Sequence, residues 1–111
     1  MNSRDKGKRG ELELAAYLRE HGFEARRGQQ FSGAAGDADV VHSIRGVHIE
    51  CKRVERLDLD GAMAQATRDA GATSKIPVVM HRKNRTPWLA TLPLADLLNF
   101  IKEARNGRSF D

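Results

Sequence analysis

Asp39, Glu50 and Lys52 are the residues whose types and spacing indicate chemistry. A turn at 45–46 joins the two strands that we expect to carry them. With a two-residue turn, Asp39 falls directly opposite Lys52, and directly opposed residues share one face of a sheet. Glu50 then lies on the same face, diagonal to Asp39. A four-residue turn keeps this register, whereas a three-residue turn shifts it.

Two carboxylates and an ammonium group on one face suit metal-dependent hydrolysis of a phosphodiester. Carboxylate oxygens are preferred ligands of a hard cation such as Mg²⁺. Such a cation polarises the phosphodiester, lowers the pKa of a bound water and stabilises the leaving oxygen. A neighbouring lysine orients the attacking water or neutralises charge on the phosphorane. The alternative is an Asp39–Lys52 ion pair on a solvated face, which is common and contributes little to stability.

Three features of the sequence favour the metal site over the ion pair. Glu50 belongs to the run Val-His-Ile-Glu-Cys-Lys, and a solvated strand has no need to gather acid and base at the end of an apolar run. Asp39 follows a polar, glycine-rich loop at 28–37 that could admit a substrate. Glu11 lies on the expected first helix, and packing of that helix on the sheet could bring a third carboxylate close.

The apolar pattern predicts a single α/β domain over residues 1–111. Leucines four residues apart indicate the first helix, and the alternation of Val47, Ile49 and Cys51 indicates a strand with one apolar face. We expect helices at 7–21, at 58–72 and from Pro93 onward, and strands at 23–27, 39–44, 47–53, 76–81 and 88–92. This order predicts a central mixed five-stranded sheet flanked by helices, with a flexible arm at 1–5 and a flexible tail at 105–111.

The composition is that of a small globular domain with a surplus of positive charge. The 111 residues include 19 Lys and Arg against 15 Asp and Glu, which gives a formal net charge of +4. No apolar run is long enough to cross a bilayer, and the N-terminus has no secretory pattern, so we expect an intracellular, cytoplasmic protein. One cysteine, Cys51, excludes an internal disulfide and a cysteine-only zinc site.

Basic residues gather in three separate segments, which we expect to bind DNA. They are Lys6, Lys8 and Arg9; then Arg26 and Arg27; then Arg82, Lys83 and Arg85, with Lys75 a little earlier. If the three segments converge on one face, they follow a phosphate backbone. The alternative for any one segment is a solubilising surface. The few aromatic residues show no repeated spacing, which argues against a base-stacking platform for single strands.

An ordered set of motifs along the chain resembles a known family. The set is Lys6-Gly7 followed by Glu11, then His21-Gly22-Phe23, Arg27, Ser32-Gly33, Asp39-Val40-Val41 and Ile49-Glu50-Cys51-Lys52. It resembles the archaeal-type Holliday junction resolvases of the PD-(D/E)xK nuclease superfamily. The stretches around Gln65 and at 81–88 resemble the phage-encoded relatives in particular. The resemblance covers residues 6 to about 101, and the ordered set is more specific than the E-x-K element alone.

The resemblance implies a restriction-endonuclease-like fold and a magnesium-dependent endonuclease that resolves four-way DNA junctions in recombination and repair. It implies Mn²⁺ as a substitute cation and a homodimer that makes paired symmetric nicks. It assigns the metal to Asp39, Glu50, the Cys51 carbonyl and Glu11, and catalysis to Glu11, Asp39, Glu50, Lys52 and Gln65. It places Arg27 and Ser32 near the scissile phosphate. For a phage-encoded protein, the compartment is the host cytoplasm.

Two positions depart from the family pattern, and two other functions stay open. Ala38 replaces the motif's proline, whose role is backbone shape, and Asp60 stands where an aromatic is expected, which puts a DNA or dimer contact in doubt. The alternatives are a less selective endonuclease on branched or duplex DNA, and a non-catalytic DNA-binding module on the same fold. The four histidines, His48 included, lack the spacing of a metal site.

Overall fold

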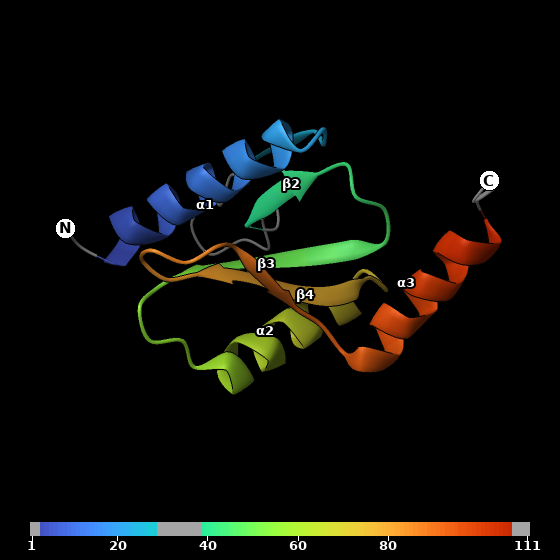
Figure 1. The fold of residues 1–111 in the computed structure, drawn as a ribbon. Helices are drawn as coiled ribbons and strands as arrows, with labels where there is room; N and C mark the ends of the chain where they lie inside the picture. The colour runs from blue at the N-terminus through green and yellow to red at the C-terminus, as the bar shows by residue number, and fades with distance from the viewer. Residues whose placement is uncertain (1–2, 29–38, 108–111) are drawn as a thin grey trace.

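The computed structural model describes residues 3–28 and 39–107, with side chains from residue 5 onward (Figure 1). Within these ranges the chain forms three helices and five strands. In chain order they are α1 (Ser3–Glu20), β1 (Ala25–Arg27), β2 (Val40–His42), β3 (Val47–Arg53), α2 (Leu59–Gly71), β4 (Ile76–Arg82), β5 (Leu89–Thr91) and α3 (Leu94–Asn106). The predicted loop at 28–37, including Ser32, lies almost entirely outside the described residues.

The described strands form two sheets, so the expected single five-stranded sheet is not observed. In one sheet, β1 pairs with β2 in antiparallel register. In the other, β3 pairs with β4 in parallel along its whole length, and β5 is antiparallel to β4. Parallel neighbours need a crossover connection, and α2 supplies it.

The predicted register of Asp39 opposite Lys52 is wrong, because β2 pairs with β1 and the described strands show no ladder between β2 and β3. Ser43 extends the pairing with the preceding strand, since its N–H donates to the Glu24 carbonyl. Gly46 then turns the chain with a φ of 74°, a value that glycine adopts without strain. The turn is where the sequence predicts it, but it does not close a hairpin.

Two helices cover opposite faces of the β3–β4 pair, and this divides the core in two (Figure 1). On the α1 side, the buried core comprises Leu14, Ala15, Leu18, Val40, Val47, Ile49, Cys51 and Val78. On the α2 side, it comprises Ala62, Ala66 and Val79. The alternation predicted for β3 is confirmed, because its odd residues pack toward α1. Its even residues, among them Glu50 and Lys52, therefore face α2.

Gly10 lets α1 approach β3 closely, because a Cβ atom at this position would lie 2.6 Å from the Cβ atom of Arg53. The helix begins at Ser3, earlier than predicted, so part of the expected flexible arm is helical. It ends before Gly22, whose φ of 91° suits the predicted stop. The close approach sets Glu11, the next residue, beside the end of β3.

The last helix, α3, follows Pro93 and lies to one side of the two covered faces (Figure 1). None of its side chains is fully buried, although Phe100 packs against the larger core. Within the described ranges, no helix has both the length and the apolar character needed to span a membrane.

Candidate metal centre and nucleic-acid interface

Asp39 lies against the edge of β3 that β4 does not occupy. The backbone N–H of Cys51 donates a 3.0 Å hydrogen bond to Asp39 Oδ2. In a strand, the N–H and C=O of one residue point to the same side. The Cys51 carbonyl therefore points toward the Asp39 side of the strand. The predicted pair of a carboxylate and a backbone carbonyl meets at this edge.

Glu50 places a second carboxylate beside Asp39, and its residue surface is 2% exposed. One oxygen, Oε1, lies 3.1 Å from His48 Nε2, whereas Oε2 has no hydrogen-bond partner among the described residues. Burial, reinforced by the negative charges of Asp39 and Asp69, raises the pKa of Glu50 to about 9. Oxygen donors that are buried, unpartnered and crowded by like charge fit a divalent cation.

Glu11 adds the third carboxylate from α1. Arg27 Nε donates a 2.8 Å hydrogen bond to Glu11 Oε1. Burial and the charge of Asp39 raise the pKa of Glu11, while Arg27 and Lys52 act in the opposite direction. The helix glutamate, the Asp39 carboxylate and two cationic groups are therefore within electrostatic reach of one another, as the sequence predicts.

Lys52 is positioned by α2, because its Nζ donates a 3.2 Å hydrogen bond to Gln65 Oε1. The even face of β3 and one face of α2 meet here. An open groove runs over this point and is lined by Lys6, Gly7, Glu11, Asp39, Cys51, Lys52, Arg53, Val54 and Gln65. Every candidate for catalysis or metal ligation named from the sequence lies in this groove or, like Glu50, buried next to it.

Two further groups approach Glu50 that sequence reasoning did not assign to the centre. His48, Glu50 and Asp69 bring one potential ligand atom each within 4.8 Å of one another. The spacing of the histidines predicts no ligand role for His48, and no motif in the sequence marks Asp69. The available signals were the shared strand face of His48 and Glu50, and the helical spacing of four residues between Gln65 and Asp69.

The basic segments divide into residues near the groove and residues that serve the fold. Lys6 and Arg9 line a hollow beside the groove, together with Asn84 of the turn after β4. Lys83 and Arg85 are exposed on that turn. The guanidinium of Arg82 is engaged internally, with Nε bound to the Thr86 carbonyl at 2.7 Å and Nη1 to Glu13 at 3.3 Å.

Glu13 is paired with basic neighbours. Its carboxylate accepts hydrogen bonds from Arg53 and Arg82. Lys8 is exposed on α1. Lys75 lies at the opposite end of β4 from Lys83, so the run of basic residues from 75 to 85 in the sequence is not one cluster in space.

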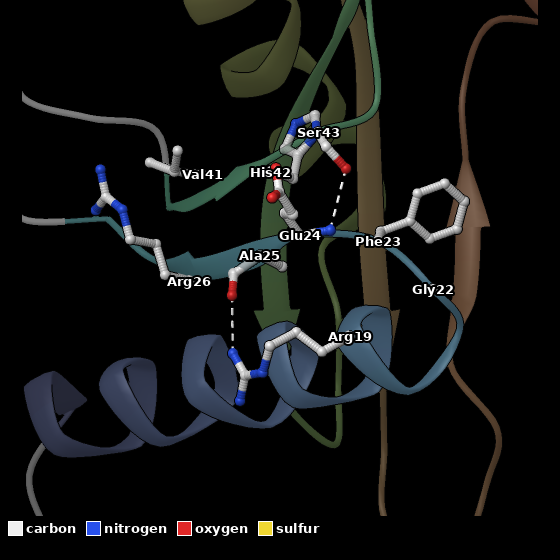
Figure 2. A pocket seen from close by; sticks show the side chains of 9 residues that line it. All are labelled: Arg19, Gly22, Phe23, Glu24, Ala25, Arg26, Val41, His42 and Ser43. Atoms are coloured by element: carbon white, nitrogen blue, oxygen red, sulfur yellow. Dashed lines mark hydrogen bonds between the residues drawn. The ribbon is translucent and has the colours of Figure 1, made fainter.

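The predicted arginine pair separates across β1, because neighbouring residues of a strand point to opposite faces. Arg27 reaches Glu11 in the metal centre. Arg26 instead lines a different hollow, formed where α1, β1 and β2 meet (Figure 2). There Arg19 Nη1 binds the Ala25 carbonyl, and the Glu24 N–H donates to Ser43 Oγ. Only one of the two arginines therefore contacts the centre.

A small α/β fold that gathers two carboxylates and a lysine at one strand is the arrangement of the PD-(D/E)xK nucleases. The family described as "Phage putative PDDEXK endonuclease" matches residues 2–109, and the chain belongs to this family. The resemblance seen in the sequence is thereby confirmed at the level of the nuclease family.

The fold is also similar to that of Hjc from Archaeoglobus fulgidus, a Holliday junction resolvase from an archaeal hyperthermophile. The TM-score is 0.56 at 23% sequence identity, and the match covers 76% of this chain and 74% of that chain. A search of curated proteins gives no significant match.

Proposed function

We propose that this nuclease is a metal-dependent, structure-specific endonuclease that resolves four-way DNA junctions, with Mg²⁺ as its cation and Mn²⁺ as a substitute. The observation that supports metal-dependent cleavage is the convergence of Asp39, Glu50 and Lys52. Glu50 lies beside the Asp39 carboxylate, and one of its buried oxygens has no hydrogen-bond partner in the described part of the chain. Lys52 projects into the adjoining groove. A non-catalytic DNA-binding module has no need of this arrangement.

Each residue of the centre has a role in this proposal. Asp39, Glu50 and the Cys51 carbonyl hold the cation, with Glu11 as a further acid on the α1 side. When bound, the cation supplies Lewis-acid stabilisation of the phosphodiester and a more acidic water. Lys52, held by Gln65, orients the attacking water or neutralises charge on the phosphorane. Arg27 lies beside Glu11 and, with Ser32, is assigned to the scissile phosphate.

The DNA path follows basic residues on both sides of the groove. Lys6, Lys8 and Arg9 lie on the first turns of α1, and Lys83 and Arg85 lie on the turn after β4. The shared hollow of Lys6, Arg9 and Asn84 joins these two segments. We assign the phosphate contacts to these five residues and to Arg26 and Arg27, and give Arg82 a supporting role through Glu13. The fold likeness to a junction resolvase supports a branched substrate.

A homodimer is part of the proposal, because the described residues of one chain form one such centre and a junction needs two symmetric nicks. The α3 helix supports it. Four large apolar side chains form an exposed stripe at helical spacing, namely Leu94, Leu97, Leu98 and Ile101. An apolar stripe of this kind does not suit contact with DNA. A second copy of the chain carries the same stripe, so a twofold contact through α3 covers the stripes of both chains.

Cleavage of a labelled four-way junction and of a linear duplex of matched sequence, each with Mg²⁺ and with EDTA, tests the proposed function. We expect Mg²⁺-dependent paired nicks in the junction and little cutting of the duplex.

Asp39→Asn and Glu50→Gln are expected to abolish cleavage while junction binding persists in Ca²⁺, since metal ligation and phosphate contact are separate contributions. Glu20→Gln, at the exposed end of α1, serves as the control for lost negative charge. Cleavage by both centre variants at the wild-type rate contradicts the metal centre, and equal cutting of both DNAs favours the less selective endonuclease.

A further inference from the structure

A second set of potential metal ligands lies on the α2 side of β3. His48 and Glu50 are alternate residues of the strand and share the face that α2 covers. Asp69 lies on α2, one turn after the Gln65 that binds Lys52. A ring nitrogen of His48 and a carboxylate oxygen from each acid lie within 4.8 Å of one another. The strand and the helix thus place three donors together, and of these only Glu50 is also assigned to the first cation.

The burial of Glu50 and its unpaired oxygen distinguish the His48–Glu50–Asp69 group from a chance cluster of acids. Its side chain is 3% exposed, and that of His48 is 10% exposed. Oε2 of Glu50 is buried without a hydrogen-bond partner among the described residues. Leaving a buried acceptor unpaired costs free energy. Two other carboxylates interact with Glu50, namely Asp39, which precedes β2, and Asp69 of α2.

The distances suit ligands of one ion. Two adjacent ligands at bonds of about 2.1 Å are about 3.0 Å apart in octahedral coordination. His48 Nε2 and Glu50 Oε1 are separated by 3.1 Å. Opposite ligands on the same ion are about 4.2 Å apart, so a group spanning 4.8 Å needs to contract by several tenths of an ångström. Asp69 is exposed and free to make this movement, and its exposure gives the ion a path from solvent.

We propose that His48, Glu50 and Asp69 bind a second divalent cation, with Glu50 shared between it and the cation at Asp39. The inference deepens the proposed function and rests on it for the first cation position. Imidazole favours transition metals, whereas carboxylate-only sites suit Mg²⁺. The second position therefore binds Mn²⁺ more tightly than Mg²⁺.

Titration of the metal-free full chain with Mn²⁺, followed by EPR of the unbound ion, tests this without DNA or turnover. Wild-type protein is expected to bind two Mn²⁺ per chain. Asp69→Asn and His48→Gln are each expected to weaken one of the two sites by at least about 10-fold. Asp60→Asn removes an exposed carboxylate from the same helix outside the cluster, and is expected to bind as wild type does.

Pulsed EPR of Mn²⁺ on the wild-type chain gives a readout that needs no variant to fold. The expected signature is nitrogen modulation from one imidazole, and His48→Gln removes it. Absence of that modulation in wild type, or unchanged Mn²⁺ binding in both variants, overturns the inference. A single site lost only in Asp39→Asn overturns the second cation and leaves the proposed function standing. A His48-dependent site in a chain that cuts no DNA supports the second cation and contradicts the nuclease.

Discussion

Glu50 is buried beside the carboxylates of Asp39 and Asp69, an arrangement that opposes folding when no cation is bound. The pKa of its carboxyl group rises from an ordinary 4.5 to about 9. The folded chain therefore holds this proton more tightly than the unfolded chain. The stability that the proton provides is complete below the ordinary pKa, and it is lost as the pH rises toward 9. A bound cation offsets that loss at neutral pH.

Glu50→Gln is expected to stabilise the metal-free protein at neutral and alkaline pH. The amide carries no charge, so the decline of stability with pH that Glu50 causes disappears. That decline has a limiting slope of about 1.4 kcal/mol per pH unit for one proton. Thermal melts in EDTA from pH 5 to pH 9 measure it, with Glu20→Gln as the exposed control. If wild type and Glu50→Gln show the same pH slope, Glu50 does not titrate in this range.

The part of the centre that depends on strand alternation could be predicted from the sequence, whereas the part that depends on contacts between elements could not. Asp39, Glu50 and Lys52 were predicted to converge, and they do, because strand alternation alone fixes the face of Glu50 and Lys52. The contact of Asp39 with the Cys51 amide needs the path of the chain between them. His48 shares the strand face of Glu50, but Asp69 approaches Glu50 only because α2 crosses β3 at a particular place, which no local spacing reveals.

At the scale of elements, local patterns determined the helices and strands, whereas their pairing depended on distant partners. The bounds of β3 were predicted at 47–53, since its alternation is clean and a turn glycine precedes it. The pairing predicted from the sequence is wrong, because β2 pairs with β1 and not with β3, the next strand along the chain. The edge of β3 facing β2 is instead occupied by the Asp39 side chain, and β4 pairs on the other edge.

Gly10→Ala is expected to move α1 away from β3 and to weaken the metal centre. The added methyl would lie 2.6 Å from Arg53 Cβ, an atom that cannot move without the strand. Overpacking of this kind costs about 1–3 kcal/mol, and Glu11 moves with the helix. Thermal melts and Mg²⁺-dependent cleavage measure the two effects. Gly7→Ala is the control on the same helix, because its Cβ meets nothing within 4 Å and alanine favours the helix. Equal melting temperatures for Gly10→Ala and wild type contradict the close-approach argument.

The turn after β4 is expected to contribute phosphate contacts to DNA binding. Removing two such contacts with Lys83→Gln and Arg85→Gln reduces the slope of log affinity against log salt by up to about 1.8. Fluorescence anisotropy with a labelled junction in Ca²⁺ at several salt concentrations measures the slope. Arg45→Gln with Lys75→Gln removes the same charge at the opposite end of β3 and β4, where we expect an unchanged slope. Identical slopes for both double variants place the turn away from DNA.

At the scale of the whole molecule, the candidate metal centre and the proposed dimer contact lie on different elements. The metal centre and the basic residues around it lie at the end of β3, between α1 and α2. The leucine stripe lies on α3, and none of the centre's residues belongs to that helix. A twofold contact through α3 therefore leaves both centres open to DNA. Under the proposed function, we expect junction selectivity to depend on two copies acting together, because simultaneous engagement of two weak duplex contacts multiplies their affinities.

Leu94→Glu combined with Leu98→Glu is expected to give a folded monomer that cuts DNA without preferring junctions. Both positions are exposed, at 66% and 48%, so the charges disturb a contact between chains rather than the core. Light scattering measures the mass, and competition of junction binding by excess linear duplex measures selectivity. Ala95→Glu with Asn99→Glu places the same two charges on exposed positions away from the stripe, and this control should remain dimeric. The monomer should release singly nicked junctions, because one centre makes one cut before the chain dissociates. A verified monomer that still prefers junctions and cuts in pairs places selectivity within one chain, and a stripe variant that remains dimeric places the interface elsewhere than α3.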